Sequence, residues 1–199
     1  MTTTFLLVRH GSHDWLDHVL CGRMDGVGMG AAGRGEAAQA ADRLAGAGAT
    51  VVYTSPLQRT RETADIIGAR LGLPVEPQSD LTELDLGAWT GARFDALHAD
   101  PSWDAWNARR SLTRPPGGES MGEAQMRAVR GLDAIRLARP DTTVIAVSHS
   151  DIIKAIIAHY LGLNLDFLQR LEIAPASIST MVVGDWGAKV VRLNEGAAS

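Results

Sequence analysis

The chain has 199 residues, 45% of them hydrophobic, so it can bury a substantial core and fits one domain better than two. Its formal net charge of −4 gives no overall attraction to nucleic acid or to a membrane surface, and neither is expected as a partner. Cys21 is the one cysteine, which excludes an internal disulfide framework. Because residues 1–9 also lack the pattern of a charged and then apolar leader, we expect a cytoplasmic location.

Short apolar runs rich in β-branched residues predict central strands at 4–8, 50–53 and 143–147. Helical periodicity appears between and after these runs, in 37–45, 57–71 and 126–135. This alternation predicts an α/β fold, a three-layer α/β/α sandwich with a mostly parallel central sheet.

The expected helix starts carry capping signals. Ser55, which precedes Pro56, is predicted to be an N-cap, and Ser120 with Glu123 has the pattern of a capping box. Ser150 is a third predicted N-cap. Each helix should therefore begin close to the end of the preceding segment.

The last third of the chain predicts an antiparallel edge. Its strands are expected at 179–183 and 189–193, joined by a turn at 184–187, and a homodimer formed along this edge is left open. The least regular segment is 86–118, which is rich in Trp and Arg and which we expect to form a lid-like insertion in a single domain spanning 1–199.

Reactive side chains follow the three central strands directly. The first strand runs into Arg9 and His10, the second is followed by Arg59, and the third by His149. Ligands of α/β sheets bind beyond the carboxyl ends of the strands, so these side chains should converge. Arginine forks and helix N-termini suit a phosphate group, and a neutral imidazole can attack phosphorus to form a phosphohistidine.

The sequence also resembles the histidine phosphatase superfamily, in the branch that contains cofactor-dependent phosphoglycerate mutases. The resemblance rests on blocks that occur in order along nearly the whole chain: Leu7-Val-Arg-His-Gly11, Gly22 with Gly33-Arg-Gly-Glu36, Ser55-Pro-Leu-Gln-Arg59 with Thr63-Ala64, 81–91, Gly117-Gly-Glu-Ser120 and Val147-Ser-His149. It implies a phosphoglycerate mutase-like fold. It also implies that His10 is phosphorylated, that Arg9, Arg59 and His149 hold the phosphoryl group, and that Glu83 donates and accepts the proton.

The expected substrate contacts extend beyond the two arginines. They are Ser12, His13, Leu16, Cys21, Gly22 and Ser150. The family often carries Asn at the place of Leu16, so one phosphate donor is missing here. The histidines lack His-x-x-x-His spacing and a carboxylate cluster, so we expect no metal and no cofactor.

The sequence thus predicts a metal-independent phosphatase that hydrolyses small phosphomonoesters through phospho-His10. A phosphoglycerate-type phosphomutase is the first alternative, although only Arg109-Arg110 resembles its paired-arginine segment. A non-catalytic module that binds phosphorylated ligands is the second. Together with Arg93 and Arg114, this arginine pair would make the lid basic and favour an acidic or multiply phosphorylated substrate, whose identity stays open.

Overall fold

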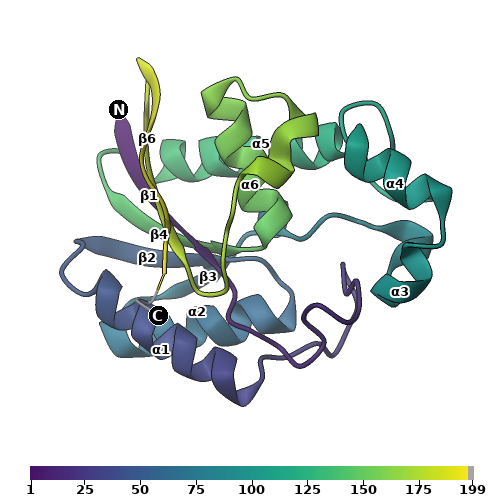
Figure 1. The fold of residues 1–199 in the computed structure, drawn as a ribbon. Helices are drawn as coiled ribbons and strands as arrows, with labels where there is room; N and C mark the ends of the chain where they lie inside the picture. The colour runs from purple at the N-terminus through teal and green to yellow at the C-terminus, as the bar shows by residue number, and fades with distance from the viewer. Residues whose placement is uncertain (197–199) are drawn as a thin grey trace.

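A six-stranded sheet lies in the middle of the molecule in the computed structural model, which describes residues 1–196 (Figure 1). Its strands, in the order β3-β2-β4-β1-β5-β6, are β3 (Val75–Pro77), β2 (Ala49–Thr54), β4 (Thr143–Ser148), β1 (Thr2–Arg9), β5 (Ile178–Gly184) and β6 (Gly187–Glu195). The first four pair in parallel, whereas β5 runs antiparallel to β1 and β6 antiparallel to β5. The predicted strands and the antiparallel edge are confirmed. Strand β3 was not predicted, because a three-residue strand is too short to show a periodicity.

Two helices cover each face of the sheet (Figure 1). Helices α1 (Ala31–Leu44) and α2 (Gln58–Leu71) pack on one face, and α5 (Met121–Ala138) and α6 (Ser150–Leu161) on the other. Side chains alternate along β1, so Phe5 and Leu7 join one apolar cluster while Leu6 and Val8 join the other. The predicted three-layer α/β/α sandwich is confirmed, and this alternation explains why its central strands read as continuous apolar runs.

One of the three predicted N-caps is confirmed and two were wrong. The capping box of Ser120 and Glu123 is present. Helix α2 instead begins at Gln58 with Leu57 as its N-cap, and α6 begins at Ser150 itself with His149 as its N-cap. The prediction at Ser55 was wrong because the chain remains irregular for three residues after β2, which frees the Ser55 hydroxyl for another partner.

The segment 86–118 projects to one side of the sheet, at the right of Figure 1. It contains the short helices η2 (Gly87–Trp89), α3 (Phe94–Leu97) and α4 (Pro101–Ala108). Trp89, Trp103 and Trp106 pack on one another, with ring centroids 5.3–5.8 Å apart, and all three belong to the larger apolar cluster of the core. The segment is therefore anchored by its own aromatic side chains.

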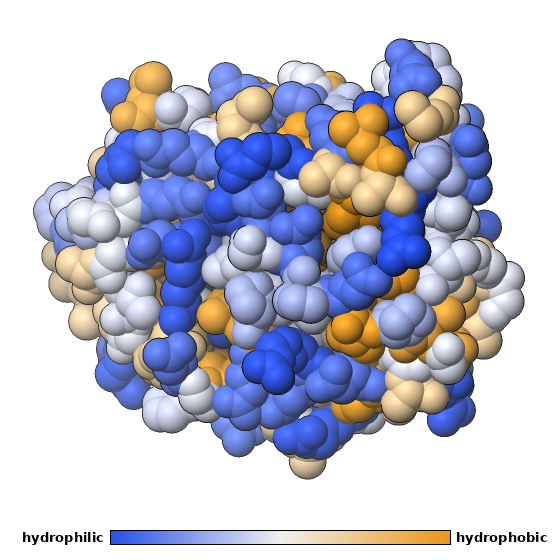
Figure 2. Space-filling model, turned by 180° about the vertical axis from the view of Figure 1, so that it is seen from behind, coloured by the Kyte–Doolittle hydropathy of each residue, from blue (hydrophilic) through white to orange (hydrophobic). Residues whose placement is uncertain are grey.

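Two further short helices complete the described chain, η1 (Ser79–Leu81) and η3 (Leu165–Arg170). Hydrophilic residues cover most of the face seen in Figure 2, with hydrophobic residues in patches between them. Within residues 1–196, every helix is too short or too polar to cross a membrane.

Candidate active site

The carboxyl ends of the parallel strands bring the predicted residues together. Arg9 lies opposite Ser148 in the register of β1 and β4, and the His10 amide donates to the Ser148 carbonyl at 3.0 Å. The Ser55 amide donates to the Val147 carbonyl at 3.0 Å. These pairings place the His10 and His149 rings with their centroids 5.3 Å apart.

His10 is held as a neutral ring whose unprotonated Nε2 lies beside Arg59. Its Nδ1–H donates to the Gly11 carbonyl at 2.8 Å, so Nε2 carries the lone pair, and the Arg59 Nε–H donates to Nε2 at 3.3 Å. Burial, and then the charges of Arg59 and Arg9, hold the His10 pKa well below its usual value. The ring is therefore unprotonated at neutral pH, the form that can act as a nucleophile.

Two arginine side chains present donors that have no protein partner. Arg59 is 2% exposed, and although its Nη2 donates to the Gly22 carbonyl at 2.8 Å, its buried Nη1 has no partner within residues 1–196. Arg9 donates from Nη1 to the Ile173 carbonyl at 2.7 Å. Its buried Nε also has no hydrogen-bond partner among residues 1–196. A buried, unsatisfied donor costs about 1–3 kcal/mol, so these groups favour binding of an anion between them.

His149 is fully buried and is oriented from both ring nitrogens. Arg59 Nη2 lies 3.2 Å from Nδ1, and because a guanidinium only donates, Nδ1 accepts. Nε2–H then donates to Ser55 Oγ at 2.8 Å. Ser55, predicted as a helix cap, thus positions His149 instead, and no sequence pattern indicated this contact.

Glu83 lies in an irregular segment between η1 and η2, with its Oε2 3.7 Å from His149 Nδ1. Its Oε1 accepts from the Leu84 amide at 2.9 Å. Burial, reinforced by the charge of Asp151 and opposed by Arg59 and Arg9, raises the pKa of Glu83 to about 7. A carboxyl with this pKa can both give and take a proton near neutral pH.

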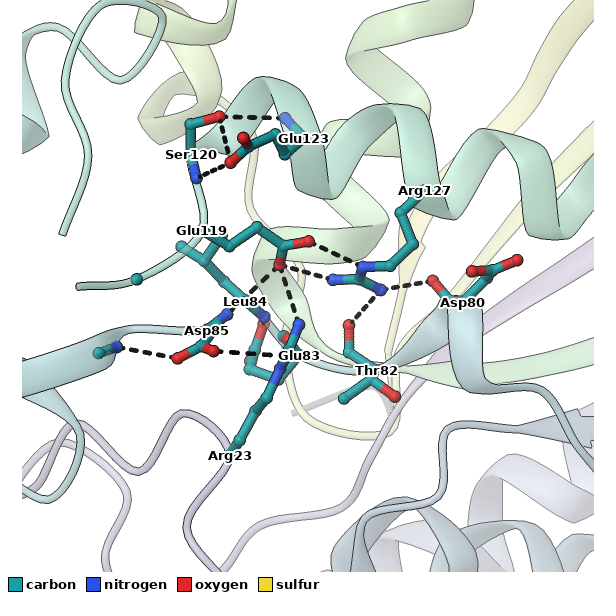
Figure 3. Close-up of polar contacts among 12 residues, drawn as sticks. Arg23, Asp80, Thr82, Glu83, Leu84, Asp85, Glu119, Ser120, Glu123 and Arg127 are labelled. Carbon is teal, nitrogen blue, oxygen red and sulfur yellow. Dashed lines mark hydrogen bonds and ion pairs between the residues drawn. The ribbon is translucent and has the colours of Figure 1, made fainter.

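The segment that carries Glu83 is held through its backbone by two arginines (Figure 3). Arg127 of α5 donates from Nη1 to the carbonyls of Asp80 and Thr82, at 2.6 and 2.9 Å. Arg23, from the loop that follows Gly22, donates from Nε to the Glu83 carbonyl at 2.8 Å. Regular structure is absent here, so these guanidinium contacts define the local path of the chain.

Glu119 joins the two arginines (Figure 3). It accepts two hydrogen bonds from Arg127, both 2.9 Å long, and one from Arg23 at 3.0 Å. Its own amide donates to the Asp85 carbonyl at 2.8 Å. Glu119, Arg127 and Arg23 therefore form a connected hydrogen-bond network that holds the Glu83 segment in place.

A pocket of about 190 Å³ opens over these groups. It is lined by Arg9, His10, Arg59 and Glu83, and by four of the predicted contacts, His13, Leu16, Cys21 and Gly22. The His13 ring stacks on His10 at 5.5 Å between centroids, and burial lowers its pKa to about 4. Burial raises the pKa of Cys21, so its sulfur is a thiol at neutral pH.

Three of the predicted site residues, Ser12, His149 and Ser150, do not line this pocket. Ser12 donates to the Glu36 carboxylate from both its amide and its hydroxyl, each at 2.8 Å, so its polar groups are already used. Ser150 is the first residue of α6, one position beyond His149.

Sequence reasoning missed two acidic residues in the pocket wall, Asp17 and Asp151. Asp151 forms an ion pair with Arg110, with 3.0 Å between Oδ2 and Nη1. The Arg110 guanidinium lies 3.9 Å from the centre of the Trp106 ring. The position of Asp151, two residues after His149 in the first turn of a helix, could have indicated it. Nothing in the sequence pattern singled out Asp17.

The arginines of the segment 86–118 do not make the pocket basic. None of the four lines it, and Arg93 and Arg114 are paired with Asp95 and Glu123 on the surface. Within residues 1–196, no group of three or more His, Cys, Asp or Glu side chains is arranged to hold a metal ion.

Comparisons with known proteins identify relatives of this chain. The Mycobacterium tuberculosis protein named "Bifunctional protein Rv2228c" is 36% identical over 194 residues, which cover 96% of this chain and 53% of that protein. The chain thus spans about half the length of that relative. The "Probable phosphoglycerate mutase GpmB" of Erwinia tasmaniensis is 32% identical over 180 residues, 87% of this chain and 81% of that protein.

Among solved structures, the native mycobacterial glucosyl-3-phosphoglycerate phosphatase Rv2419c superposes with a TM-score of 0.88 at 25% identity, covering 98% of this chain and all of that one. This similarity confirms the phosphoglycerate mutase-like fold. The model of the histidine phosphatase superfamily, branch 1, matches residues 5–196. The match spans nearly the whole chain, as the sequence resemblance predicted, so the chain belongs to the histidine phosphatase superfamily, branch 1.

Proposed function

We propose that the protein is a phosphatase that hydrolyses small phosphomonoesters through a phosphohistidine on His10. The observation that carries the proposal is the environment of His10: its unprotonated Nε2 lies beside Arg59, in a pocket that also holds Arg9 and a carboxyl, Glu83, with a pKa near 7. A nucleophile, donors for anionic oxygens and a proton donor thus face one space.

In the first step, the free donors of Arg9 and Arg59 bind the phosphate oxygens, and His10 Nε2 attacks phosphorus. The bond to the ester oxygen breaks, and Glu83 gives its proton to the departing alkoxide. In the second step, the Glu83 carboxylate takes a proton from water, and the oxygen of that water attacks phospho-His10. Inorganic phosphate leaves, and His10 and protonated Glu83 are restored.

His149 can adapt to the bound phosphate through Ser55. A hydroxyl both donates and accepts, so Ser55 Oγ can bind Nε2 in either tautomer of the ring. When a phosphoryl oxygen replaces Arg59 as the neighbour of Nδ1, the proton moves to Nδ1 and Ser55 donates to Nε2. His149 then stabilises the transferring group as a neutral donor, since burial and nearby positive charges disfavour its protonated form.

A phosphomutase is the second candidate, favoured by the 32% identity to the relative named as a probable phosphoglycerate mutase. A mutase needs a phosphohistidine that water does not discharge and a site for a bisphosphorylated acid. The pocket holds about 190 Å³, and the arginines of 86–118 lie outside its wall, which supports the phosphatase. A non-catalytic binding module would need neither a nucleophilic His10 nor a carboxyl whose pKa is raised to about 7, as that of Glu83 is.

The test is release of phosphate from p-nitrophenyl phosphate and a panel of phosphorylated metabolites, with excess EDTA, by the wild type and His10→Ala. Turnover that survives EDTA and disappears in the variant supports the proposal. Transfer of phosphate to phosphoglycerate instead of water would identify a mutase, and binding without turnover would identify a binding module. Loss of wild-type activity in EDTA would contradict the metal-independent mechanism.

A further inference from the structure

The part of the pocket beyond the phosphate-binding groups is mainly apolar. Its wall is formed by Leu16, Val19 and Leu20 from the loop after β1, together with Leu86 and Phe94 from the segment 86–118. Phe94 begins α3 and is fixed from behind by Trp103, at 6.2 Å between ring centroids. A backbone bridge between Val19 and Arg93 joins the two segments, so one continuous wall faces the space where the leaving alcohol of a phosphoester would lie.

Two acidic side chains, Asp17 and Asp151, interrupt this wall. The charge of Asp151 is balanced by Arg110, whose side chain is only 4% exposed. Asp17 is exposed and makes no side-chain hydrogen bond or ion pair with any residue of 1–196. Its φ of 62° is a conformation that residues other than glycine rarely adopt, and it occurs within the turn in which the His18 and Val19 amides donate to the Trp15 carbonyl, at 3.1 and 3.0 Å.

Positive charge is confined to the phosphate end of the pocket. The cations in its lining are Arg9 and Arg59, which flank His10. Arg110 lies behind Asp151 and over Trp106 and is absent from the lining, and Arg109 is exposed outside it. A second anionic group on a substrate would therefore meet apolar side chains and an unbalanced carboxylate.

We infer that this wall is a leaving-group subsite that accepts an apolar alcohol, uncharged or bearing an amine, and that Asp17 selects against alcohols carrying a carboxylate or a second phosphate. The inference rests on the proposed phosphatase function. An anion in the subsite would lose part of its hydration without gaining a positively charged partner and would be repelled by Asp17. An aromatic or aliphatic group would bury apolar surface against Phe94 and Leu16. This reverses the preference for acidic substrates that the arginines of 86–118 suggested in the sequence.

The test compares three aryl phosphates whose phenols differ little as leaving groups: phenyl phosphate, 3-(aminomethyl)phenyl phosphate and 3-carboxyphenyl phosphate. We expect kcat/KM of the wild type, measured with EDTA, to be at least ~10-fold lower for the carboxylate than for either of the others. A carboxylate substrate that matches or exceeds phenyl phosphate would overturn the inference. If none of the three compounds were hydrolysed, the proposed phosphatase function would be rejected instead.

The second arm assigns the selection to Asp17. In Asp17→Asn, the ratio of kcat/KM for the aminomethyl and carboxyl substrates should fall about 3- to 10-fold, and asparagine tolerates the left-handed backbone at this position. Asp14→Asn is the matched control, because it removes an exposed negative charge from the same loop outside the pocket lining, and its ratio should equal that of the wild type. Equal ratios in Asp17→Asn and the wild type would contradict the role of Asp17.

Discussion

The two sides of the pocket are built in different ways. On one side, Arg9 ends β1, and His10 and His149 come directly after β1 and β4, so the register of the sheet fixes their positions. On the other side, Glu83 lies in a segment without regular structure, and the support comes from side chains of α5 and of distant loops. Backbone pairing thus places the phosphate-binding groups, whereas a network of ion pairs places the acid.

This difference carries an energetic consequence. A strand in the middle of the sheet is fixed by many hydrogen bonds and by burial on both faces, so the loss of one contact shifts it little. The Glu83 segment depends on a few guanidinium contacts, and a shift of about 1 Å in a catalytic group can reduce the rate about 10²-fold. We therefore expect the acid side to be the more sensitive to substitutions outside the pocket.

The largest expected effect on the acid side comes from Glu83→Gln. An amide cannot give a proton to the alkoxide, so kcat for alkyl phosphates should fall about 10²- to 10⁴-fold. The first step with p-nitrophenyl phosphate should fall much less, because its leaving group departs as a stable anion. Rapid-quench kinetics with the two substrate types checks this difference, and equal losses on both would remove Glu83 from the role of acid.

Arg127→Met tests the support beneath Glu83. We expect kcat for alkyl phosphates to fall about 10- to 100-fold with KM little changed, and p-nitrophenyl phosphate to be affected less in its first step. Arg130→Met is the matched control, because Arg130 lies on the same helix and pairs with the Asp80 side chain but is 69% exposed. If both variants lost the same activity, the support would have no specific effect on the acid.

The pH dependence separates the two sides without a substitution. The acid must be protonated, and its pKa is raised to about 7, so kcat/KM for alkyl phosphates should fall about tenfold per pH unit above pH 7. The His10 pKa lies well below its usual value, so His10 should produce no loss between pH 7 and 6. Below about pH 6 the phosphate group itself gains a proton. Activity that rises steadily from pH 7 to 9 would contradict this assignment.

Ser55→Ala should have the smallest effect, on the phosphate-binding side. It removes the partner of the buried His149 Nε2, which costs about 1–3 kcal/mol of stability and loosens the ring. Because strand pairing still holds Ser148 and α6 begins directly after His149, we expect KM to rise only a few-fold. Urea denaturation and steady-state kinetics measure the two effects, and an unchanged stability would contradict the hydrogen bond.

The sequence allowed prediction of the strand side in some detail. Apolar runs locate β1, β2 and β4, and the parallel arrangement then requires Arg9, His10 and His149 to meet at one edge of the sheet. This reasoning needs only local periodicity and a general rule of α/β sheets. Short features escaped it, such as β3 and the start of α2, because a few residues show no period.

The acid side could not be predicted from periodicity. One glutamate in an irregular segment has no local signature, and Glu83 was identified only through the family resemblance. The placement of Arg23, Arg110 and Arg127 depends on contacts between residues far apart in the chain, so the sequence did not show that the arginines of 86–118 lie outside the pocket lining. Pairing of charges is a property of the folded chain, and composition does not show it.

The central claim is that His10 carries the phosphoryl group. The most direct measurement uses Glu83→Gln with ³²P-labelled p-nitrophenyl phosphate, quenched in base, because the first step survives in this variant while water is activated slowly. We predict about one acid-labile, base-stable label per chain, on the peptide containing His10, and no label when His10→Ala is added. Turnover without any labelled protein, or a label on another residue, would contradict the account.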